Sequence, residues 1–518
     1  MKPGRGFLAA FPAVASCLSG AVLLGLSFLG GLHAVGQTPF SSVPRVDAAF
    51  APAEPSADSR APGAREVLAQ YGLTGTPLER FVSGTPIAPD EEEILAQLLY
   101  YLPRLGDDAL AGSQQVHDLD TLAASPQEHR LEAVHLRGTV VSIQRVPLLP
   151  ELAERMEFDH YYQVHLTLHE APYDAVVCVR RVPAALKDAQ PQGEPCAADA
   201  LFLKVGEVAL QRPQLVFAAL RLAWLPDRVD PQRGIGPEHV ALARLGMDQG
   251  LWEDVRAAQR KELSPRDREA FYQALVAVGR PEAAPKLMPH QRPLDLVALL
   301  EQPDPHLGQV VEVEGTARRV VKVAVTDPAV RNRFQIEHYF QIDLFVPLGP
   351  ETSIRLGADP TGEKNPVFHN NFPTTMLARH LPPGLAEGEN LRVPIRAHAL
   401  FFKVWAYRSP YAARFGQLQP APLFMAIQTQ VLPPFKPTAN WVTSLLVTLA
   451  MGLALGMLAL VVWWVGGGQH SSARSRRRVQ GNAPQIPVWA APSEEQATTQ
   501  EGPPREGSEC GGGPRSEP

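Results

Sequence analysis

The hexapeptide ALFLKV (Ala200–Val205) returns as ALFFKV (Ala399–Val404), with only its fourth letter changed. The signals around the two copies come in the same order: a glycine-punctuated strand, a second strand, a proline step, the hexapeptide and an apolar run. An order of signals that repeats in this way indicates a duplicated unit. We therefore expect two modules, over residues 119–226 and 294–434.

Alternating apolar residues indicate that both modules are built from β-strands. The first copy contains AVHLRGTVVSIQRV and DHYYQVHLTL, and the second contains VVEVEGTARRVVKV and EHYFQIDLFV. Strands of this kind, separated by turn residues, are typical of small β units. The apolar face of the second strand is formed by Tyr162, Val164, Leu166 and Leu168 in copy one and by Phe340, Ile342, Leu344 and Val346 in copy two. The expected fold class is α+β, mostly β, with two tandem small β-barrel modules.

Two further segments follow the helical period. The lead-in, residues 64–118, contains PDEEEILAQLLYYLPRL, in which Asp90 is the expected helix cap and the apolar stripe should pack on the module that follows. The connector, residues 227–293, contains a second helix that is expected to start at Ser264 and to stop at Gly279. The two modules are thus expected to be joined by helices.

The N-terminal region is predicted to direct export. Residues 1–36 combine a basic start with a long apolar run, which is typical of a signal peptide and also long enough for an uncleaved anchor. A lipidation motif ending at Cys17 is a further alternative. Residues 37–63 are rich in Pro, Ala and Ser without periodicity and are expected to be a linker.

Residues 441–465 are predicted to cross a lipid bilayer, because they contain no charge and are long enough for a tilted span. Four arginines follow, at Arg474 and in the run of residues 476–478, which predicts a cytoplasmic, disordered tail over 466–518 and a body outside the cytoplasm. Gly452 and Gly456 have the spacing that lets two membrane helices approach closely, so a homodimer is plausible.

Composition and motifs exclude several classes of function. A net charge of −6 disfavours binding to duplex nucleic acid. The chain lacks the nucleophile-elbow, zinc-protease and phosphate-loop motifs, so we expect no enzyme and no cofactor. A metal site is not expected either, because the pair His165 and His169 is replaced by Asp343 and Pro347 in copy two.

The candidate ligand-binding residues are Phe202 with Lys204 and Phe401 with Lys403, which strand alternation places together on the face away from the core. An aromatic ring beside a cation can stack a planar group and neutralise an anion, as oligonucleotide- and oligosaccharide-binding barrels do. Alternatively, the rings are packed under a neighbouring element and the lysines reach past them to water. We favour the packed interpretation.

Cys178 and Cys196 are the only cysteines in the predicted exported body, where a disulfide could form between them. The alternative is that Cys178 is a small core residue and Cys196 a loop thiol.

The openings LRGTVVSIQRV and VEGTARRVVKV, followed by HYYQV or HYFQI, resemble the first strands of OB-like barrels. Together with the acidic helix and the C-terminal anchor, the pattern resembles uncharacterised membrane-anchored proteins of planctomycete-type bacteria. That resemblance implies no site residues, because no activity is attached to the family. We expect a membrane-tethered extracytoplasmic binding or scaffolding protein of the cell envelope. The alternatives are a receptor for an oligosaccharide or single-stranded polyanion on the Phe/Lys faces, and an enzyme with an unrecognised site.

Overall fold

The computed structural model describes residues 44–46, 63–105, 118–169, 171–187, 193–209, 212–357, 365–433 and 441–467. The chain forms two compact units, Met1–Phe435 and Lys436–Pro518. The expected signal segment, most of the expected linker and nearly all of the C-terminal tail lie outside the described residues.

A first β-barrel is formed by six strands with the order β1-β2-β3-β5-β4-β6. Pairing between β1 and β4 closes the sheet on itself, and β3 and β5 run parallel while the other neighbours are antiparallel. The strands of this first barrel are β1 (Ala133–Pro147), β2 (His160–Leu168), β3 (Asp174–Val179), β4 (Pro195–Ala209), β5 (Arg212–Ala219) and β6 (Ala223–Trp224). The closed part consists of β1 to β5, and β6 pairs only with β4. A closed barrel of five strands is the arrangement expected of an OB-like fold.

A second barrel has the strand order β13-β14-β12-β9-β8-β7 and is closed by pairing between β13 and β8. Here β12 and β14 are the parallel pair within the closed barrel. Its strands are β7 (Arg292–Pro293), β8 (Val310–Ala324), β9 (His338–Pro347), β12 (Asn371–Ala378), β13 (Val393–Tyr407) and β14 (Gln419–Val431), and the short β10 (Ile354–Arg355) pairs with β11 (Val367–Phe368) beside it. The prediction of a mostly β protein with barrel closure is therefore confirmed.

The glycine of the first strand lies at the same kind of crossing in both barrels. A Cβ atom on Gly138 would stand 2.6 Å from the backbone oxygen of Thr167, and one on Gly315 would stand 2.7 Å from that of Phe345. Because backbone atoms cannot move aside as a flexible side chain can, only glycine allows the two strands to approach this closely.

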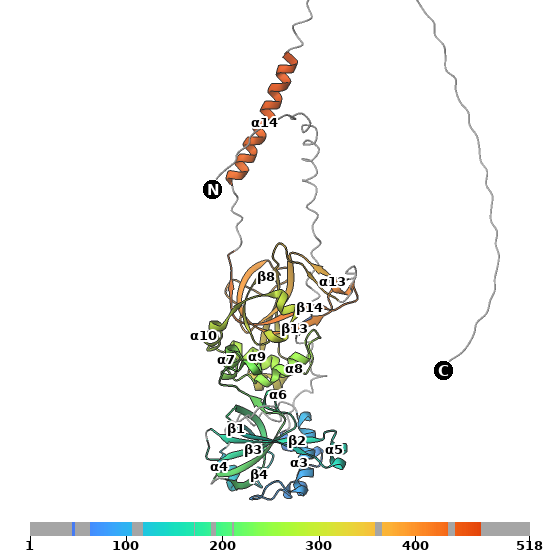
Figure 1. Cartoon of the computed structure of the whole chain (residues 1–518), viewed down its shortest axis with the longest axis vertical. Coiled ribbons are helices and arrows are strands. Elements are labelled where there is room, and N and C mark those ends of the chain that lie inside the picture. The colour runs from blue at the N-terminus through green and yellow to red at the C-terminus, as the bar shows by residue number, and fades with distance from the viewer. Residues whose placement is uncertain are drawn as a thin grey trace, which may run out of the picture. The chain divides into compact units, whose positions relative to one another are not determined.

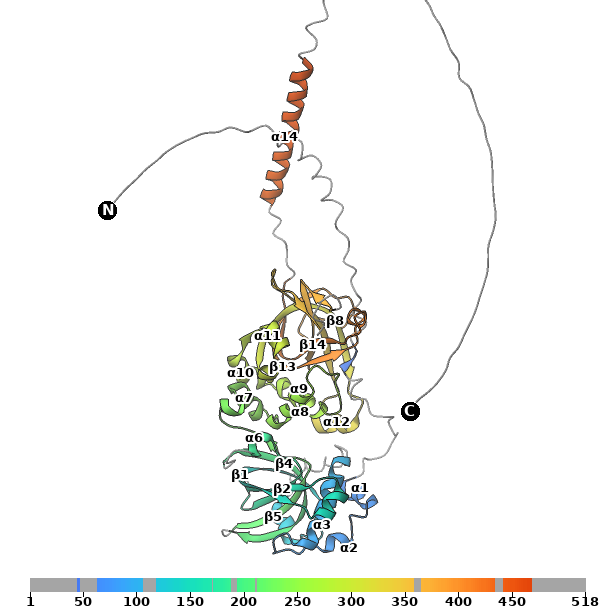
Figure 2. The ribbon, with the colours of Figure 1, turned by 45° about the vertical axis from the view of Figure 1, so that its right-hand side comes forward.

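Helices α1 (Ala64–Gln70), α2 (Thr76–Glu79), α3 (Pro89–Tyr101) and α5 (Pro150–Met156) share one apolar cluster on an outer side of the first barrel, and Figure 2 shows α1 to α3 beside the strands. The short α4 (Leu119–Ala124) and α6 (Ala184–Lys187) instead bury Leu122 and Leu186 in the cluster of the barrel interior. The predicted apolar stripe of α3 is buried, from Ile94 to Leu99. The predicted cap at Asp90 is wrong: the helix starts at Pro89 and the Glu91 carboxylate accepts from the backbone N–H of Ala88.

The connector packs against the second barrel, where α8 and α9 contact β13 (Figure 1). The connector helices are α7 (Pro237–Arg244), α8 (Trp252–Ala257), α9 (Arg268–Gly279) and α10 (Ala283–Leu287), and the segment of the second barrel adds α11 (Leu296–Glu301), α12 (Pro328–Phe334) and α13 (Pro410–Ala413). Helix α9 ends at Gly279 as predicted, but Ser264 precedes a turn and Asp267 is the residue before the helix. Its apolar residues Phe271 and Leu275 are fully buried.

The apolar face predicted for β2 lies inside the first barrel, where Val164 and Leu166 join a core cluster with residues of β1, β4 and β5. The opposite face of β4 and β5 belongs to a separate cluster that includes the stripe of α3. Strands β3, β4 and β5 are therefore buried on two sides, by the barrel interior and by helices, whereas several outer residues of β1 are exposed. This double burial decides where the candidate site residues lie.

The last helix is α14 (Trp441–Gly467). Its segment Leu445–Trp464 has a mean hydropathy of 2.6, none of it is buried, and it is long and apolar enough to cross a membrane. One apolar helix of this kind is consistent with the predicted span.

Candidate functional site: buried lysine–carboxylate pairs

Phe202 and Phe401 lie in the barrel interiors, and neither is exposed to solvent. The ring of Phe202 contacts that of Phe217 at 5.6 Å, and the ring of Phe401 lies 5.8 Å from that of Phe424. The face predicted to be open is thus the inside of the barrel. The rings are packed, as we favoured, but within the barrel and not under a neighbouring element, and the lysines are buried instead of reaching water.

Each phenylalanine is separated from its lysine by a β-bulge. The register between β4 and β5 shifts between Phe202 and Lys204, and that between β13 and β14 shifts between Phe401 and Lys403. A bulge adds one residue to a strand and so moves the following side chain to the other face. The prediction that Phe and Lys share a face is therefore wrong, since alternation assumed an unbroken strand.

Lys204 forms a fully buried ion pair with Glu91 of helix α3. Its Nζ lies 2.6 Å from Glu91 Oε2 and also donates to the carbonyl oxygen of Pro86 at 3.0 Å. The other carboxylate oxygen of Glu91 accepts from the backbone N–H of Val82 at 2.7 Å. The charges and hydrogen-bonding groups of the pair are thereby matched inside the protein.

Lys403 forms the corresponding pair with Asp267, the residue that precedes helix α9. Its Nζ lies 2.9 Å from Asp267 Oδ1, and both side chains are fully buried. Asp267 Oδ2 accepts from the backbone N–H and the hydroxyl of Ser264 at 2.9 and 3.1 Å. Burial lowers the pKa of Lys403, and the charge of Asp267 opposes that shift.

The two pairs do the same thing chemically: each joins a barrel strand to the first turn of the helix that covers it. In the second barrel the aromatic ring next to the lysine, Phe402, packs against Trp252 of α8 and Phe271 of α9. Each lysine is fully buried and its charge is already matched by a carboxylate of this chain. The predicted ligand-binding residues are thus enclosed by this chain itself, the phenylalanines inside the barrels and the lysines beneath helices.

The predicted disulfide is absent. Cys178 and Cys196 are both buried free thiols. Cys178 belongs to the cluster beneath α3 and Cys196 to the barrel interior, and β5 runs between their strands β3 and β4. Burial raises the pKa of Cys178 to about 12, so this thiol is unreactive at neutral pH.

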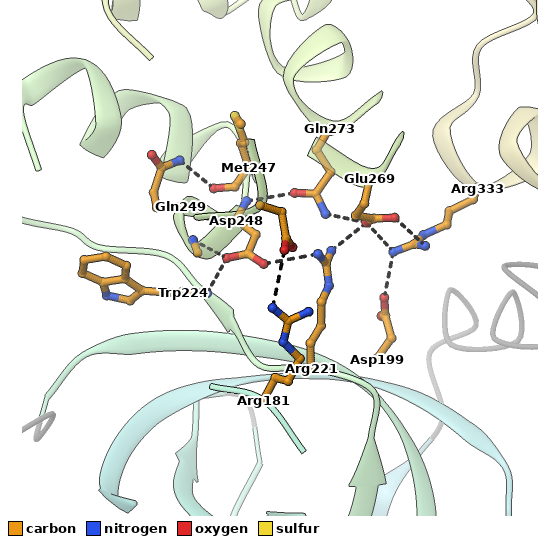
Figure 3. A network of polar contacts seen from close by, with 12 residues as sticks. Arg181, Asp199, Arg221, Trp224, Met247, Asp248, Gln249, Glu269, Gln273 and Arg333 are labelled. Atoms are coloured by element: carbon orange, nitrogen blue, oxygen red, sulfur yellow. Dashed lines mark hydrogen bonds and ion pairs between the residues drawn. The ribbon is translucent and has the colours of Figure 1, made fainter. Parts of the chain in front are cut away.

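A polar network joins the first barrel to the connector and to the second barrel (Figure 3). The carboxylate of Glu269 in α9 accepts from Arg221, which follows β5, at 2.7 Å, and from both terminal nitrogens of Arg333 in α12, at 2.8 and 3.0 Å. Arg333 also lies 3.6 Å from Asp199 of β4. Three parts of the chain that are far apart in sequence are held together by these charges.

Asp248 is the buried acid of this network. It accepts from the backbone N–H groups of Trp224 and Gly250 at 2.9 and 2.8 Å and lies 3.7 Å from Arg221. Burial raises its pKa, although Arg221 and the two N–H groups act in the opposite direction. Its bonds hold the end of the first barrel on the connector, so its role is structural.

A second polar group that sequence reasoning missed lies on the outer face of β9. Gln341 donates to Asp343 Oδ1 at 3.0 Å, and Arg319 of β8 donates to Asp343 Oδ2 at 3.0 Å. Burial raises the pKa of Asp343 to about 6, despite the opposing effects of Gln341 and Arg319. Alternation placed Gln341 and Asp343 on this face, but nothing in the sequence showed what covers them.

His165 and His169, the histidine pair considered above as a metal site, have different surroundings. His169 bonds the Thr139 hydroxyl at 2.6 Å, and burial lowers the pKa of His165, which disfavours its charged form. Within the described ranges, no group of three or more His, Cys, Asp or Glu side chains is placed to hold a metal ion.

No protein-family model matches the chain, and no curated protein matches it. Among solved structures, a small single-stranded DNA-binding protein from Streptomyces coelicolor is 12% identical, with a TM-score of 0.15 and coverage of 24% of this chain and 93% of that one. The single-stranded DNA-binding protein from Thermus aquaticus is 8% identical, with a TM-score of 0.14 and coverage of 59% and 94%. An aspartyl-tRNA synthetase from Entamoeba histolytica is 12% identical, with a TM-score of 0.13 and coverage of 46% and 51%. At such TM-scores these likenesses carry no argument, and the fold assignment rests on strand order and closure.

Proposed function

We propose that this protein is a membrane-tethered, extracytoplasmic scaffolding or binding protein of the cell envelope, built from two copies of one OB-like module. The observation that carries the scaffolding role is the full burial of Lys204 and Lys403 against carboxylates of covering helices. A face that is already filled by the protein itself supports rigid architecture over capture of an oligosaccharide or a single strand.

The duplication is supported by features that recur at matching places. Both barrels have the same strand order, a close-approach glycine in the first strand, and a bulge within the hexapeptide. The positions three residues before these glycines also correspond. In the strand register, His135 of β1 lies opposite Asp199 of β4, and Glu312 of β8 lies opposite His398 of β13. The acid and the histidine occupy exchanged strands, but only His135 and Asp199 bond each other, at 2.8 Å, whereas Glu312 pairs with Arg396 at 3.1 Å.

The tether is supported by α14 and the residues after it. A charge-free helix followed by arginines favours a span whose C-terminal end is cytoplasmic and whose preceding body is outside. Gly452 and Gly456 have the spacing at which two membrane helices approach closely, which favours a homodimer through this face. Loss of cross-linked dimer in Gly456→Ile, but not in Leu453→Ile, would support that contact, and unchanged cross-linking would exclude it.

Amine acylation of the intact chain in detergent tests the closed faces without knowledge of a ligand. We expect acetylation, read by mass spectrometry, to modify the exposed Lys286 and Lys322 quickly and to leave Lys204 and Lys403 unmodified until the protein unfolds. Rapid modification of Lys204 and Lys403 in the folded protein would contradict the scaffolding proposal. It would instead favour the alternative that these lysines belong to an open receptor site for an oligosaccharide or a single-stranded polyanion.

A further inference from the structure

Residues 44–46 lie against the outer face of the second barrel, within a stretch that the sequence predicted to be a linker. The side-chain oxygen of Gln341 accepts from the backbone N–H of Val46 at 3.0 Å, and its side-chain nitrogen donates to the carbonyl oxygen of Pro44 at 3.2 Å. Val46 is fully buried and belongs to the core cluster of the second barrel and connector, whereas Arg45 is exposed.

The two bonds reproduce the pairing that a neighbouring β-strand would offer. In a parallel ladder, one residue bonds the C=O and the N–H that flank the residue opposite it. Here the carboxamide of Gln341 bonds the C=O before Arg45 and the N–H after it. The contact therefore recognises the backbone on either side of Arg45 and makes no demand on the Arg45 side chain, while it places the next side chain in an apolar cluster.

Gln341 is held ready for this contact by its neighbours. It is fully buried, and its nitrogen also donates to Asp343, which is in turn fixed by Arg319. The Asp343 bond requires the nitrogen of the carboxamide, so it orients the oxygen toward the peptide N–H. A buried carboxamide oxygen without a donor is unfavourable, so the site favours occupation by a peptide N–H.

The corresponding residue of the first barrel is Gln163, in HYYQV against HYFQI. Gln163 is only half-buried and donates to the hydroxyl of Tyr161 at 3.1 Å. The rung occupied by Arg319 and Asp343 in the second barrel is occupied by Ser142 and His165 in the first. A glutamine carboxamide that is oriented by an aspartate is therefore found in the second barrel and not at the corresponding position of the first. Gln163 provides a matched control.

We propose that the outer face of the second barrel around Gln341 is a binding site for the backbone of a short peptide segment, and that residues 44–46 of this chain are its built-in occupant. The site recognises the backbone on either side of one exposed residue and an apolar side chain directly after it. The occupant fastens the segment between the predicted N-terminal export signal and the body onto the second barrel. This inference does not depend on the scaffolding role.

Limited trypsin digestion of the intact chain in detergent tests the occupied state, because a protease needs an extended, unpaired backbone at the bond it cuts. We expect the bond after Arg45 to resist in the wild type and in Gln163→Ala. In Gln341→Ala the new terminus at Val46, found by mass spectrometry, should appear at least tenfold faster. Equal cleavage in the wild type and in Gln341→Ala would overturn the proposal.

A second experiment changes the occupant instead of the site, so its main comparison, between Val46→Ser and the wild type, does not depend on how Gln341→Ala folds. Val46→Ser alters only the occupant, so the intact variant should bind a fluorescent synthetic peptide with the sequence of residues 40–50 saturably. The wild type, whose site is filled, should bind it at least tenfold more weakly, and the double variant Val46→Ser/Gln341→Ala should not bind it. Failure of Val46→Ser to bind the peptide, or equal binding by the double variant, would overturn the proposal.

Discussion

Lys204 and Lys403 show how strongly a single buried charge depends on its partner. Each lysine is fully buried against a carboxylate that is itself bonded to backbone N–H groups. A buried pair of this kind adds little net stability compared with apolar residues of similar size, but loss of one partner leaves an uncompensated charge. The two pairs therefore specify which helix covers which barrel.

Lys204→Ala should lower the free energy of unfolding by about 3–5 kcal/mol, because Glu91 is left buried and unpaired. Lys204→Met combined with Glu91→Gln should recover much of that loss, since no charge then remains in the interior. Denaturant unfolding measures both.

The control lies on the same helix: Glu93 pairs with Arg155 at 2.8 Å, with 43% and 56% of the side chains exposed. Arg155→Ala should change stability by less than about 1 kcal/mol. Equal losses in Lys204→Ala and Arg155→Ala would contradict the burial of the first pair.

Asp343 should make stability fall as pH rises. Its pKa is about 6 in the folded protein against 3.8 for an ordinary aspartate, so the folded state holds the proton more tightly than the unfolded state does. Its contribution to stability is therefore present in full below the unfolded pKa and is lost as pH rises through about 6, by on the order of 3 kcal/mol at most. Unfolding curves of the wild type and Asp343→Asn between pH 4 and 7 measure it. Parallel pH profiles for the two proteins would show that Asp343 does not titrate in this range.

At the scale of elements, the first strand of each barrel carries both curvature and closure. Strand β1 pairs with β2 and β4, and β8 pairs with β9 and β13. One strand can serve two neighbours only if it bends sharply, and each of these strands has a register shift shortly after its glycine. The glycine lets the partner strand pass close to the bend.

Gly138→Ala and Gly315→Ala should each reduce stability by about 1–3 kcal/mol, because the added Cβ meets backbone that must shift. Gly63→Ala is the matched control, since a Cβ at Gly63 has no heavy atom within 4 Å. Thermal or denaturant unfolding distinguishes them. A loss in Gly63→Ala as large as in Gly138→Ala would rule out close approach as the cause.

At the scale of the whole molecule, the barrels are fixed to each other through the connector. Glu269 accepts from Arg221 on one side and Arg333 on the other, and Arg333 also reaches Asp199 of the first barrel. Removal of Glu269 leaves two arginines close together without the shared acid between them. We therefore expect the network to fix the position of one barrel against the other and to contribute little to the stability of each barrel by itself.

Glu269→Ala should increase hydrogen exchange around Arg221 and Arg333 and leave exchange in the strand cores unchanged, because the contact opens without unfolding the barrels. The exposed Glu262 of the same connector provides the control variant Glu262→Ala. If exchange rises equally in both variants, or in neither, the network does not hold the barrels together.

Topology is also a property of the whole chain. Protease added to intact spheroplasts should digest the body before α14 and spare a tag placed after Pro518, because the arginines that follow the helix favour a cytoplasmic C-terminus. A permeabilised sample, in which the tag is lost as well, provides the control. A protected body would reverse the proposed orientation.

The sequence by itself determined the local features of this protein. Alternation placed Val164 and Leu166 inside a barrel, the 3.6-residue period identified the stripe of α3, and an uninterrupted apolar run identified α14. These patterns depend on neighbours within a few residues, so they can be read along the chain.

Only the tertiary structure decided the fate of the candidate site. A bulge of one residue reversed the faces of Lys204 and Lys403, and the acids that bind them, Glu91 and Asp267, lie more than a hundred residues away in sequence. Gln341 bonds Val46 across 295 positions. Such contacts depend on how strands and helices are brought together, and the free energy that selects them arises from burial of whole surfaces, which no local pattern contains.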